Sequence, residues 1–300
     1  MRRLTELIAA IDIGGTSIKF GVVDPTTDNF EYLGKIDTNT HLNDFKMEKR
    51  LDKVLDKILK NHSISGIAIS TAGIVDAKKG IIVHANKNIP NYKGTPLKDI
   101  LEEKYGVPVS VENDVNSALL GELTFGKFEG VNSAIMLTIG TGVGGAIYLN
   151  NEIYHGYSHS AGETGYSIVN GHRIEETAST TGLVKNVKRR LNDENIDGVW
   201  IFDQALNHNN EICIEEINRL IDELVQLIIN FVSLLNPEVV ILGGGIMEQV
   251  DYLKPLVQKR FNALYGNPFV AEHTTIDFAS LGNQAGVLGA YSYFKKQNLK

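Results

Sequence analysis

Three glycine-rich turns, each placed directly after an apolar run, constrain the fold of this chain more than any other feature. Glycine has no Cβ, so backbone N–H groups at such a turn can come close to the oxygens of a phosphate group. A tight hairpin without a ligand is the alternative for any single turn, but three turns in the same context favour phosphate binding. The runs and their turns are Leu7–Ile13 with Gly14-Gly15-Thr16, Ser133–Ile139 with Gly140-Thr141-Gly142-Val143-Gly144-Gly145, and Val239–Leu242 with Gly243-Gly244-Gly245.

The residues that follow the first two turns indicate that these turns join strands. Ile18–Val23 and Ala146–Leu149 are again apolar and rich in residues that favour strands. A dinucleotide-binding glycine fingerprint opens a helix instead. The spacing within Gly140–Gly145 therefore does not indicate a Rossmann fold.

The order of the other predicted elements is that of an α/β protein. Met47–Leu59 has apolar residues at helical spacing, and short apolar strands follow at Gly66–Ser70 and Val107–Val111. Ile214–Val232 forms a long amphipathic pattern that stops at Asn236-Pro237. The last segment, Gln284–Phe294, is predicted to be a helix.

A length of 300 residues suits two domains, and the strand, turn, strand order occurs once in each half. We expect an N-terminal lobe at residues 1–120, which carries the first turn and Asp114, and a C-terminal lobe at residues 121–300, which carries the other two turns. The last helix is in a position to return to the N-terminal lobe.

Composition excludes several classes of function. The chain has 29 basic and 36 acidic residues and a net charge of -7, which argues against nucleic acid as a partner. Its one cysteine, Cys213, permits no internal disulfide and fits a reducing compartment. No run reaches the roughly 18–20 apolar residues of a membrane span, because even Leu224–Leu235 contains polar side chains. We therefore expect a cytoplasmic protein with small-molecule partners and no membrane contact.

Three charged residues, Asp12, Lys19 and Asp114, are candidates for metal binding, phosphate binding and proton transfer. Asp12 and Lys19 flank the first turn and suit a Mg²⁺-bound polyphosphate, with Asp12 holding the water shell of the metal. A solvent-facing position on the strand is the alternative for Lys19. Asp114 lies between a predicted strand and a helix, at the sheet edge where ligands of α/β folds collect, and is the candidate general base. A helix N-cap at Asn113-Asp114 is the alternative.

These motifs resemble, in order and spacing, the signatures of the ROK family of repressors, open reading frames and kinases. The resemblance runs from about residue 8 to residue 295, and five motifs together are far more specific than any one. The motifs are Asp12-Ile13-Gly14-Gly15-Thr16, Gly73-Ile74-Val75-Asp76, Glu112-Asn113-Asp114-Val115-Asn116, Thr138-Ile139-Gly140-Thr141-Gly142-Val143-Gly144-Gly145 and Ala161-Gly162-Glu163.

The resemblance implies a two-domain actin-like fold of the RNase H type, with ATP and a sugar in the cleft between the lobes. In that family the aspartate matching Asp114 takes the proton of the acceptor hydroxyl. The glycines from Gly140 to Gly144 match the second phosphate turn, and Gly243-Gly244-Gly245 matches a turn on the adenosine side. The sugar-binding set that the resemblance implies is Gly73, Asn113, Glu163 and Glu175.

One departure from the family pattern concerns zinc. Family kinases usually carry a cysteine-rich zinc loop that ends in a glutamate and an Ala-Ser pair, but here only Glu175 and Ala178-Ser179 remain. Three histidines, His155, His159 and His172, lie nearby, yet without cysteines and without ligand spacing they do not predict a zinc site. We expect no zinc, with the loop held by packing instead.

A second departure is Tyr166, which stands where glucokinase-type members have a sugar-binding histidine. A tyrosine offers a stacking surface and one hydroxyl in place of two ring nitrogens. We expect an ATP-dependent kinase for the 6-hydroxyl of a glucose-type hexose, with a β-glucoside favoured over free glucose. N-acetylmannosamine is the runner-up substrate.

The alternative of a different class is a sugar-binding regulatory member of the family without catalysis. Family repressors carry an N-terminal helix-turn-helix, and with six residues before the first strand we expect that arm to be absent here. The resemblance also implies a homodimer.

Overall fold

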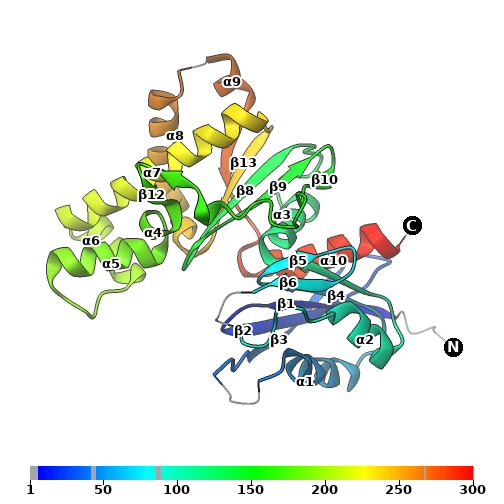
Figure 1. The fold of residues 1–300 in the computed structure, drawn as a ribbon. Helices are drawn as coiled ribbons and strands as arrows, with labels where there is room; N and C mark the ends of the chain where they lie inside the picture. Colours follow the sequence, from blue (N-terminus) through cyan, green and yellow to red (C-terminus); the bar gives the residue numbers. More distant parts are fainter. Residues whose placement is uncertain (1–5, 42–44, 86–88, 267, 300) are drawn as a thin grey trace. The chain divides into compact units, whose positions relative to one another are not determined.

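The computed structural model describes residues 6–41, 45–85, 89–266 and 268–299 (Figure 1). These residues divide into two compact units. Unit 1 takes in the chain up to Gly130, the short segment His155–Ser160 and the segment from Asn283 onward. Unit 2 takes in Val131–Tyr154 and Ala161–Gly282.

Unit 1 is a mixed sheet with helices on both faces. Its elements are β1 Leu7–Ile13, β2 Ser17–Val23, β3 Phe30–Asp37, α1 Met47–Leu59, β4 Ile64–Thr71, β5 Ile74–Asp76, β6 Ile81–His84, α2 Leu97–Tyr105, β7 Val109–Asn113, α3 Asp114–Thr124 and α10 Ala285–Asn298. The sheet has the strand order β3-β2-β1-β4-β7. Strands β1 and β2 form an antiparallel hairpin, whereas β1, β4 and β7 run parallel. The carboxyl ends of these three strands therefore meet at one edge.

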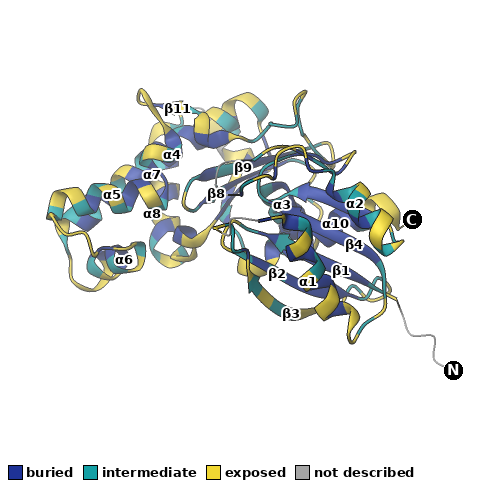
Figure 2. Cartoon of the chain, turned by 60° about the horizontal axis from the view of Figure 1, so that its bottom comes forward, coloured by how far each residue is buried: buried dark blue, intermediate teal, exposed yellow. Residues whose placement is uncertain are grey.

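Strand β1 is buried on both faces. Neighbouring residues of a strand point to opposite sides of the sheet, and each side of β1 packs against a helix. Ile11 belongs to a core cluster with Leu51 and Val54 of α1, while Ala10 belongs to another with Tyr291 of α10. Figure 2 shows β1, β4 and α10 largely in the colour of buried residues. A strand covered on both faces has no polar alternation, which explains the unbroken apolar run before the first turn.

Helices α10 and α3 cross with their backbones close together (Figure 1). A Cβ at Gly289 would lie 1.6 Å from the carbonyl oxygen of Ser117. A Cβ at Gly121 would lie 2.5 Å from the carbonyl oxygen of Ala285. Glycine at both positions therefore allows the last helix to pack against α3, some 160 residues away in the sequence.

Unit 2 is a second mixed sheet with a layer of longer helices. Its elements are β8 Ala134–Ile139, β9 Val143–Leu149, β10 Glu152–Ile153, η1 Thr164–Tyr166, β11 Ile168–Val169, β12 His172–Arg173, α4 Ile174–Thr177, α5 Thr180–Leu191, α6 Gly198–Asn207, α7 Glu211–Leu235, β13 Val239–Gly243, η2 Gly245–Glu248, α8 Val250–Leu264, α9 Pro268–His273 and β14 Thr275–Phe278. The sheet has the strand order β10-β9-β8-β13-β14. Strands β8 and β9 form an antiparallel hairpin, and β13 runs parallel to both β8 and β14.

Helix α7 supplies much of the core of unit 2. Its apolar stripe, which includes Ile217, Leu224 and Ile228, is fully buried. The Asn210 side chain accepts from the Cys213 N–H at the start of the helix, and Asn236 ends it in the left-handed conformation before a proline.

The α/β class and the main predicted elements are confirmed. Both glycine-rich turns that were expected to join strands do so, in the β1–β2 and β8–β9 hairpins. The third turn leads from β13 into the short η2 helix. In the part of the chain that the structure describes, none of the helices has the length and apolar character that crossing a membrane requires.

The contact between α10 and α3 predicts a stability effect. Gly289→Ala should lower the free energy of unfolding by about 1–3 kcal/mol, because its Cβ would overlap the backbone of Ser117. Urea denaturation measures this as a lower transition midpoint. Gly15→Ala is the matched control, since a Cβ there meets no atom within 4 Å. Equal midpoints for Gly289→Ala and wild type would show that the two helices separate at little cost.

Candidate active site

The residues predicted to form the site are carried by both units. In unit 1 they lie in the β1–β2 turn and at the carboxyl ends of strands. Unit 1 carries Asp12, Gly14, Gly15, Thr16, Lys19, Gly73, Asn113 and Asp114. In unit 2 they lie in the turns after β8 and β13 and around α4. Unit 2 carries Gly140, Thr141, Gly142, Gly144, Glu163, Tyr166, Glu175, Gly243, Gly244 and Gly245.

The pairing register of the unit 1 sheet places its polar residues in a row. Asp12 on β1 is opposite Ser70 on β4, and Ser70 is opposite Glu112 on β7. Asn113 ends β7, and Asp114 follows it as the first residue of α3. Because the strands are parallel, all these side chains reach the same edge of the sheet.

Asp12 has partners on three elements. Ser70 Oγ donates to Asp12 Oδ1 at 2.7 Å, and Lys19 Nζ lies 3.9 Å from Asp12 Oδ2. Lys19 also donates to Asn283 Oδ1 at 3.0 Å, so its ammonium is directed at this edge and not into open solvent. A Cβ at Gly286 in the first turn of α10 would lie 2.7 Å from Asp12 Cγ, so the last helix also reaches the site.

Burial raises the pKa of Asp12, and the Ser70 hydrogen bond and the Lys19 charge only partly oppose this. A carboxylate that is costly to ionise alone is stabilised by any further positive charge placed beside it.

Asn113, and not Asp114, is the N-cap of α3. Its Oδ1 accepts from the N–H groups of Val115 at 2.9 Å and Asn116 at 3.0 Å. Its Nδ2 donates to the Gly73 carbonyl at 2.9 Å and to Asp114 Oδ1 at 2.8 Å. Asn113 therefore fixes the helix start, the Gly73 turn and the Asp114 carboxylate together.

Asp114 has a strongly perturbed acidity. Burial and then the nearby Asp12 charge raise its pKa to about 7, although hydrogen bonds from Val115 and Asn113 favour the ionised form. A carboxylate whose pKa lies near neutrality can both accept and release a proton at physiological pH. Such a shift in a sheet-edge aspartate is typical of a functional site.

Sequence reasoning assigned no role to Glu112, which lies directly behind this pair. Its side chain is fully buried, and Oε1 accepts from the Asn113 N–H at 2.7 Å and from Asn116 Nδ2 at 3.0 Å. Its Oε2 lies 2.8 Å from Nε2 of His155. The sequence offered the Glu-Asn-Asp motif as a signal for Glu112, but nothing that connects it with a histidine 43 residues later.

In unit 2 the second and third turns lie side by side. Gly243 at the end of β13 is opposite Thr138 at the end of β8. A Cβ at Gly244, whose φ is 95°, would lie 2.4 Å from the Ile139 carbonyl oxygen, so only glycine permits this approach. The start of α5 closes the second turn, because the Thr180 N–H donates to the Gly140 carbonyl at 2.8 Å.

Glu175 connects the second turn with the segment around Tyr166. Glu175 Oε2 lies 3.0 Å from a Cβ built on Gly142 and 3.1 Å from one built on Gly165. Glu163 precedes η1 and is exposed. The Tyr166 ring is 59% exposed, with the Arg173 guanidinium 5.4 Å from its centroid. The arginine therefore covers one face of the ring that was expected to be a free stacking surface.

One glycine in each turn has no structural reason to lack a side chain. A Cβ on Gly15, Gly140 or Gly245 would meet no atom of the described residues within 4 Å, and none of the three has the positive φ that disfavours other residues. The space beside each of these backbones is therefore open to a ligand.

The sequence model of the ROK family matches residues 8–297, nearly the whole chain. The chain belongs to the ROK family. This confirms the resemblance found in the five motifs. The zinc loop usual in family kinases is reduced here to residues of β12 and α4, and His172 is exposed on β12. Among the described residues, no three His, Cys, Asp or Glu side chains are arranged to hold a metal ion.

Several relatives are similar over their full length. An uncharacterised protein of Clostridium perfringens is 44% identical, with 97% of this chain and 98% of that protein covered. A β-glucoside kinase of Listeria monocytogenes is 32% identical, with 97% and 98% covered. A glucokinase of Halalkalibacterium halodurans is 30% identical, with 96% and 94% covered.

Two solved ROK structures resemble this one. A Listeria monocytogenes protein with a provisional N-acetylmannosamine kinase assignment has a TM-score of 0.83 and 30% identity, with 97% of this chain and 100% of that chain covered. A Streptomyces griseus ROK glucokinase in complex with glucose and AMPPNP has a TM-score of 0.80 and 28% identity, with 97% and 100% covered. The fold is therefore the actin-like fold of the ROK kinases.

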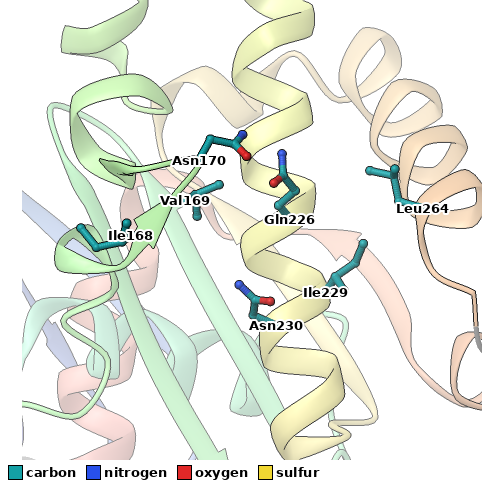
Figure 3. A pocket seen from close by; sticks show the side chains of 7 residues that line it. All are labelled: Ile168, Val169, Asn170, Gln226, Ile229, Asn230 and Leu264. Carbon is teal, nitrogen blue, oxygen red and sulfur yellow. The ribbon is translucent and has the colours of Figure 1, made fainter.

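A cavity of about 560 Å³ lies elsewhere in this ROK protein, within unit 2 (Figure 3). It is lined by Asn170 after β11, by Gln226, Ile229 and Asn230 of α7, and by Leu264 at the end of α8, together with both residues of β11. None of the predicted site residues lines it. It therefore adds nothing to the site at the glycine-rich turns.

The raised pKa of Asp114 predicts a pH-dependent stability difference. The native state favours the protonated carboxyl, so the wild type loses stability as the pH rises from the unfolded pKa of about 4 through about 7. Asp114→Asn has no charge to bury. The free energy of unfolding of this variant, measured relative to wild type, should therefore rise by about 1–2 kcal/mol from pH 5 to pH 8. This value is smaller than the full pKa shift would give, because the site is partly accessible to solvent.

Urea unfolding of both proteins at the two pH values measures this gain. Glu129→Gln, an exposed carboxyl near the end of unit 1, is the control and should show no such trend. A gain that is the same at pH 5 and pH 8 would contradict a raised pKa at Asp114.

Proposed function

We propose that this ROK protein is a sugar kinase that transfers the γ-phosphoryl group of ATP to the 6-hydroxyl of a glucose-type hexose. The observation that carries this is Asp114, a carboxylate with a pKa of about 7 that Asn113 orients at the sheet edge. Phosphoryl transfer needs positioning, charge neutralisation and an oriented nucleophile more than covalent chemistry. The glucokinase and β-glucoside kinase relatives support the same reaction class.

Asp114 acts as the general base in this proposal. Its ionised carboxylate accepts the proton of the 6-hydroxyl as the hydroxyl oxygen attacks the γ-phosphorus, and ADP leaves as the bond from that phosphorus to the β,γ-bridging oxygen breaks. Asn113 keeps Oδ1 of Asp114 in place through its amide, and a sugar hydroxyl that binds this amide would take the place of one of its two acceptors, the Gly73 carbonyl or Asp114 Oδ1. Because the Gly73 carbonyl accepts from the same amide, the Gly73 turn contributes to the position of the base.

Asp12, Lys19 and the glycine-rich turns are proposed to bind the nucleotide and its metal. Mg²⁺ is usually held by one or two carboxylates together with phosphates and waters, and Asp12 fits that role through a water. The metal would neutralise the phosphate charge. Gly15 and Gly140 bring open backbone to the phosphates, and Gly245 with its neighbours lines the adenosine side.

A β-glucoside is the favoured acceptor, with free glucose a weaker one. Tyr166 replaces the family histidine, and its ring is exposed on the face that Arg173 leaves open. Glu163 and Glu175 supply carboxylates for sugar hydroxyls on the same unit. N-acetylmannosamine is the second candidate, supported by the Listeria structure with that provisional assignment.

A cytoplasmic homodimer without nucleic-acid or membrane partners fits this activity. The single buried cysteine supports a cytoplasmic location, and the acidic net charge argues against a nucleic-acid partner. The family resemblance supports the dimer.

The direct test is ADP release with ATP, Mg²⁺ and a panel of glucose, cellobiose, an aryl β-glucoside and N-acetylmannosamine. We expect sugar-dependent release, highest in kcat/KM for the glucosides. Asp114→Asn should lower kcat by about 10²–10⁴-fold while the affinity for the nucleotide stays nearly unchanged, because a positioned base contributes about that much.

Preference for N-acetylmannosamine by tenfold or more would replace the glucoside with the amino sugar as substrate. A variant that retains more than a third of wild-type kcat would show that Asp114 is not the base. No sugar-dependent release with any acceptor would leave the non-catalytic regulatory class as the function.

The first turn predicts a separate effect on nucleotide binding. Gly15→Val should raise the KM for ATP at least tenfold and leave the KM for the sugar within twofold, because its side chain enters open space beside the backbone. Initial rates at varied ATP and varied sugar separate the two constants. Gly266→Val, at an exposed position after α8 without a positive φ, is the matched control. An unchanged dependence on ATP would make the first turn a simple hairpin.

A further inference from the structure

The segment His155–Ser160 leaves unit 2 and packs onto unit 1, where it is held at two points. His155 Nε2 lies 2.8 Å from Glu112 Oε2, and His159 Nε2 lies 3.6 Å from Asp76 Oδ2. Glu112 is on β7 and Asp76 is on β5. The segment therefore bridges the strand that leads to Asp114 and the strand that follows the Gly73 turn.

Both anchors hold the segment firmly. Glu112 is fully buried, so loss of the histidine would leave its Oε2 without this hydrogen-bond partner. Burial lowers the pKa of His155, but the hydrogen bond and charge of Glu112 outweigh it and raise the pKa overall, with Asp76 adding to the rise and Lys78 opposing it. His159 has a φ of 64°, which is uncommon outside glycine, and Ser158 and Ser160 join their hydroxyls at 2.8 Å.

Tyr157 lies between the two anchoring histidines in the sequence, and its side chain is exposed. It is 103% exposed, the full exposure of a tyrosine in an extended chain. His155 and His159 are partly buried, whereas the side chain of Tyr157 between them is left in solvent. An aromatic side chain held on a fixed segment but left uncovered is a ready contact surface for a ligand.

We propose that Tyr157 is a specificity residue that stacks on the aglycone of a β-glucoside, an inference that rests on the proposed sugar kinase activity. In the proposed function Asn113 and Asp114 hold the sugar ring, and His155 of this segment contacts Glu112, the residue that directly precedes them. A β-linked substituent extends beyond that ring and needs a surface outside it. Aryl groups and the C–H faces of a second sugar both stack on tyrosine, which accounts for one site that accepts either.

The kinetic test compares kcat/KM for phenyl β-glucoside and for glucose. Tyr157→Ala should lower the ratio of the two constants about tenfold, mainly through a higher KM for the glucoside. Tyr157→Phe should retain at least half of the wild-type ratio, because stacking needs the ring and not the hydroxyl. Tyr32→Ala, an exposed tyrosine on β3 of the same unit, is the control and should leave the ratio unchanged.

Two results would overturn the role of Tyr157: an unchanged ratio in Tyr157→Ala, or an equal loss with both acceptors. A wild type that phosphorylates glucose but not the glucoside would overturn it as well. Absence of sugar-dependent ADP release in the wild type is a different result, because it would reject the kinase activity itself.

A binding measurement that does not depend on turnover tests the same contact. Trp200 is the one tryptophan of the chain, so Tyr157→Trp combined with Trp200→Phe places a single fluorophore on the segment. Phenyl β-glucoside should change its emission in a saturable way, and glucose should change it much less. Equal responses to both sugars, or none to the glucoside, would exclude an aglycone contact.

Discussion

The burial of two carboxyl groups, Asp12 and Asp114, at one sheet edge is the constraint around which the site of unit 1 is organised. Burial raises the pKa of both carboxyl groups, and the charge of Asp12 raises the pKa of Asp114 further. Ser70 and Lys19 favour ionisation of Asp12, and Asn113 favours ionisation of Asp114. The parallel order of β1, β4 and β7 keeps the two groups at one edge despite this cost.

The same edge depends on a helix from the far end of the chain. α10 packs against core residues of β1 and, at Gly121 and Gly289, against α3, and its first turn comes close to Asp12. Asn283, just before that helix, accepts a hydrogen bond from Lys19. A substitution that displaces α10 therefore acts on stability and on the charge balance of Asp12 at once, which couples the packing of unit 1 with its chemistry.

The glycine-rich turns and the hairpins around them were predictable because local sequence decides them. The choice between base and cap at Asn113-Asp114 was not, since both residue types cap helices, and only the geometry shows Asn113 in that role. The contact between Glu112 and His155 could not be predicted from the sequence for a different reason. It depends on a segment that returns to unit 1 from unit 2, and no period or motif in the sequence encodes such a return. The contact of Arg173 with the Tyr166 ring was likewise not predictable, because it depends on the hairpin that β11 and β12 form.

Charge balance also limits how such a site can work. A polyphosphate brought to the first turn adds negative charge near Asp12 and Asp114, and by itself would raise the pKa of the base further. Lys19 is the cation that unit 1 directs at Asp12, and its distance of 3.9 Å leaves it only a partial counter-charge. Tight nucleotide binding and an ionised Asp114 are therefore compatible only when additional positive charge arrives with the phosphates. This requirement follows from the carboxylate pair alone, and it explains why a kinase of this design would use its nucleotide as a metal complex.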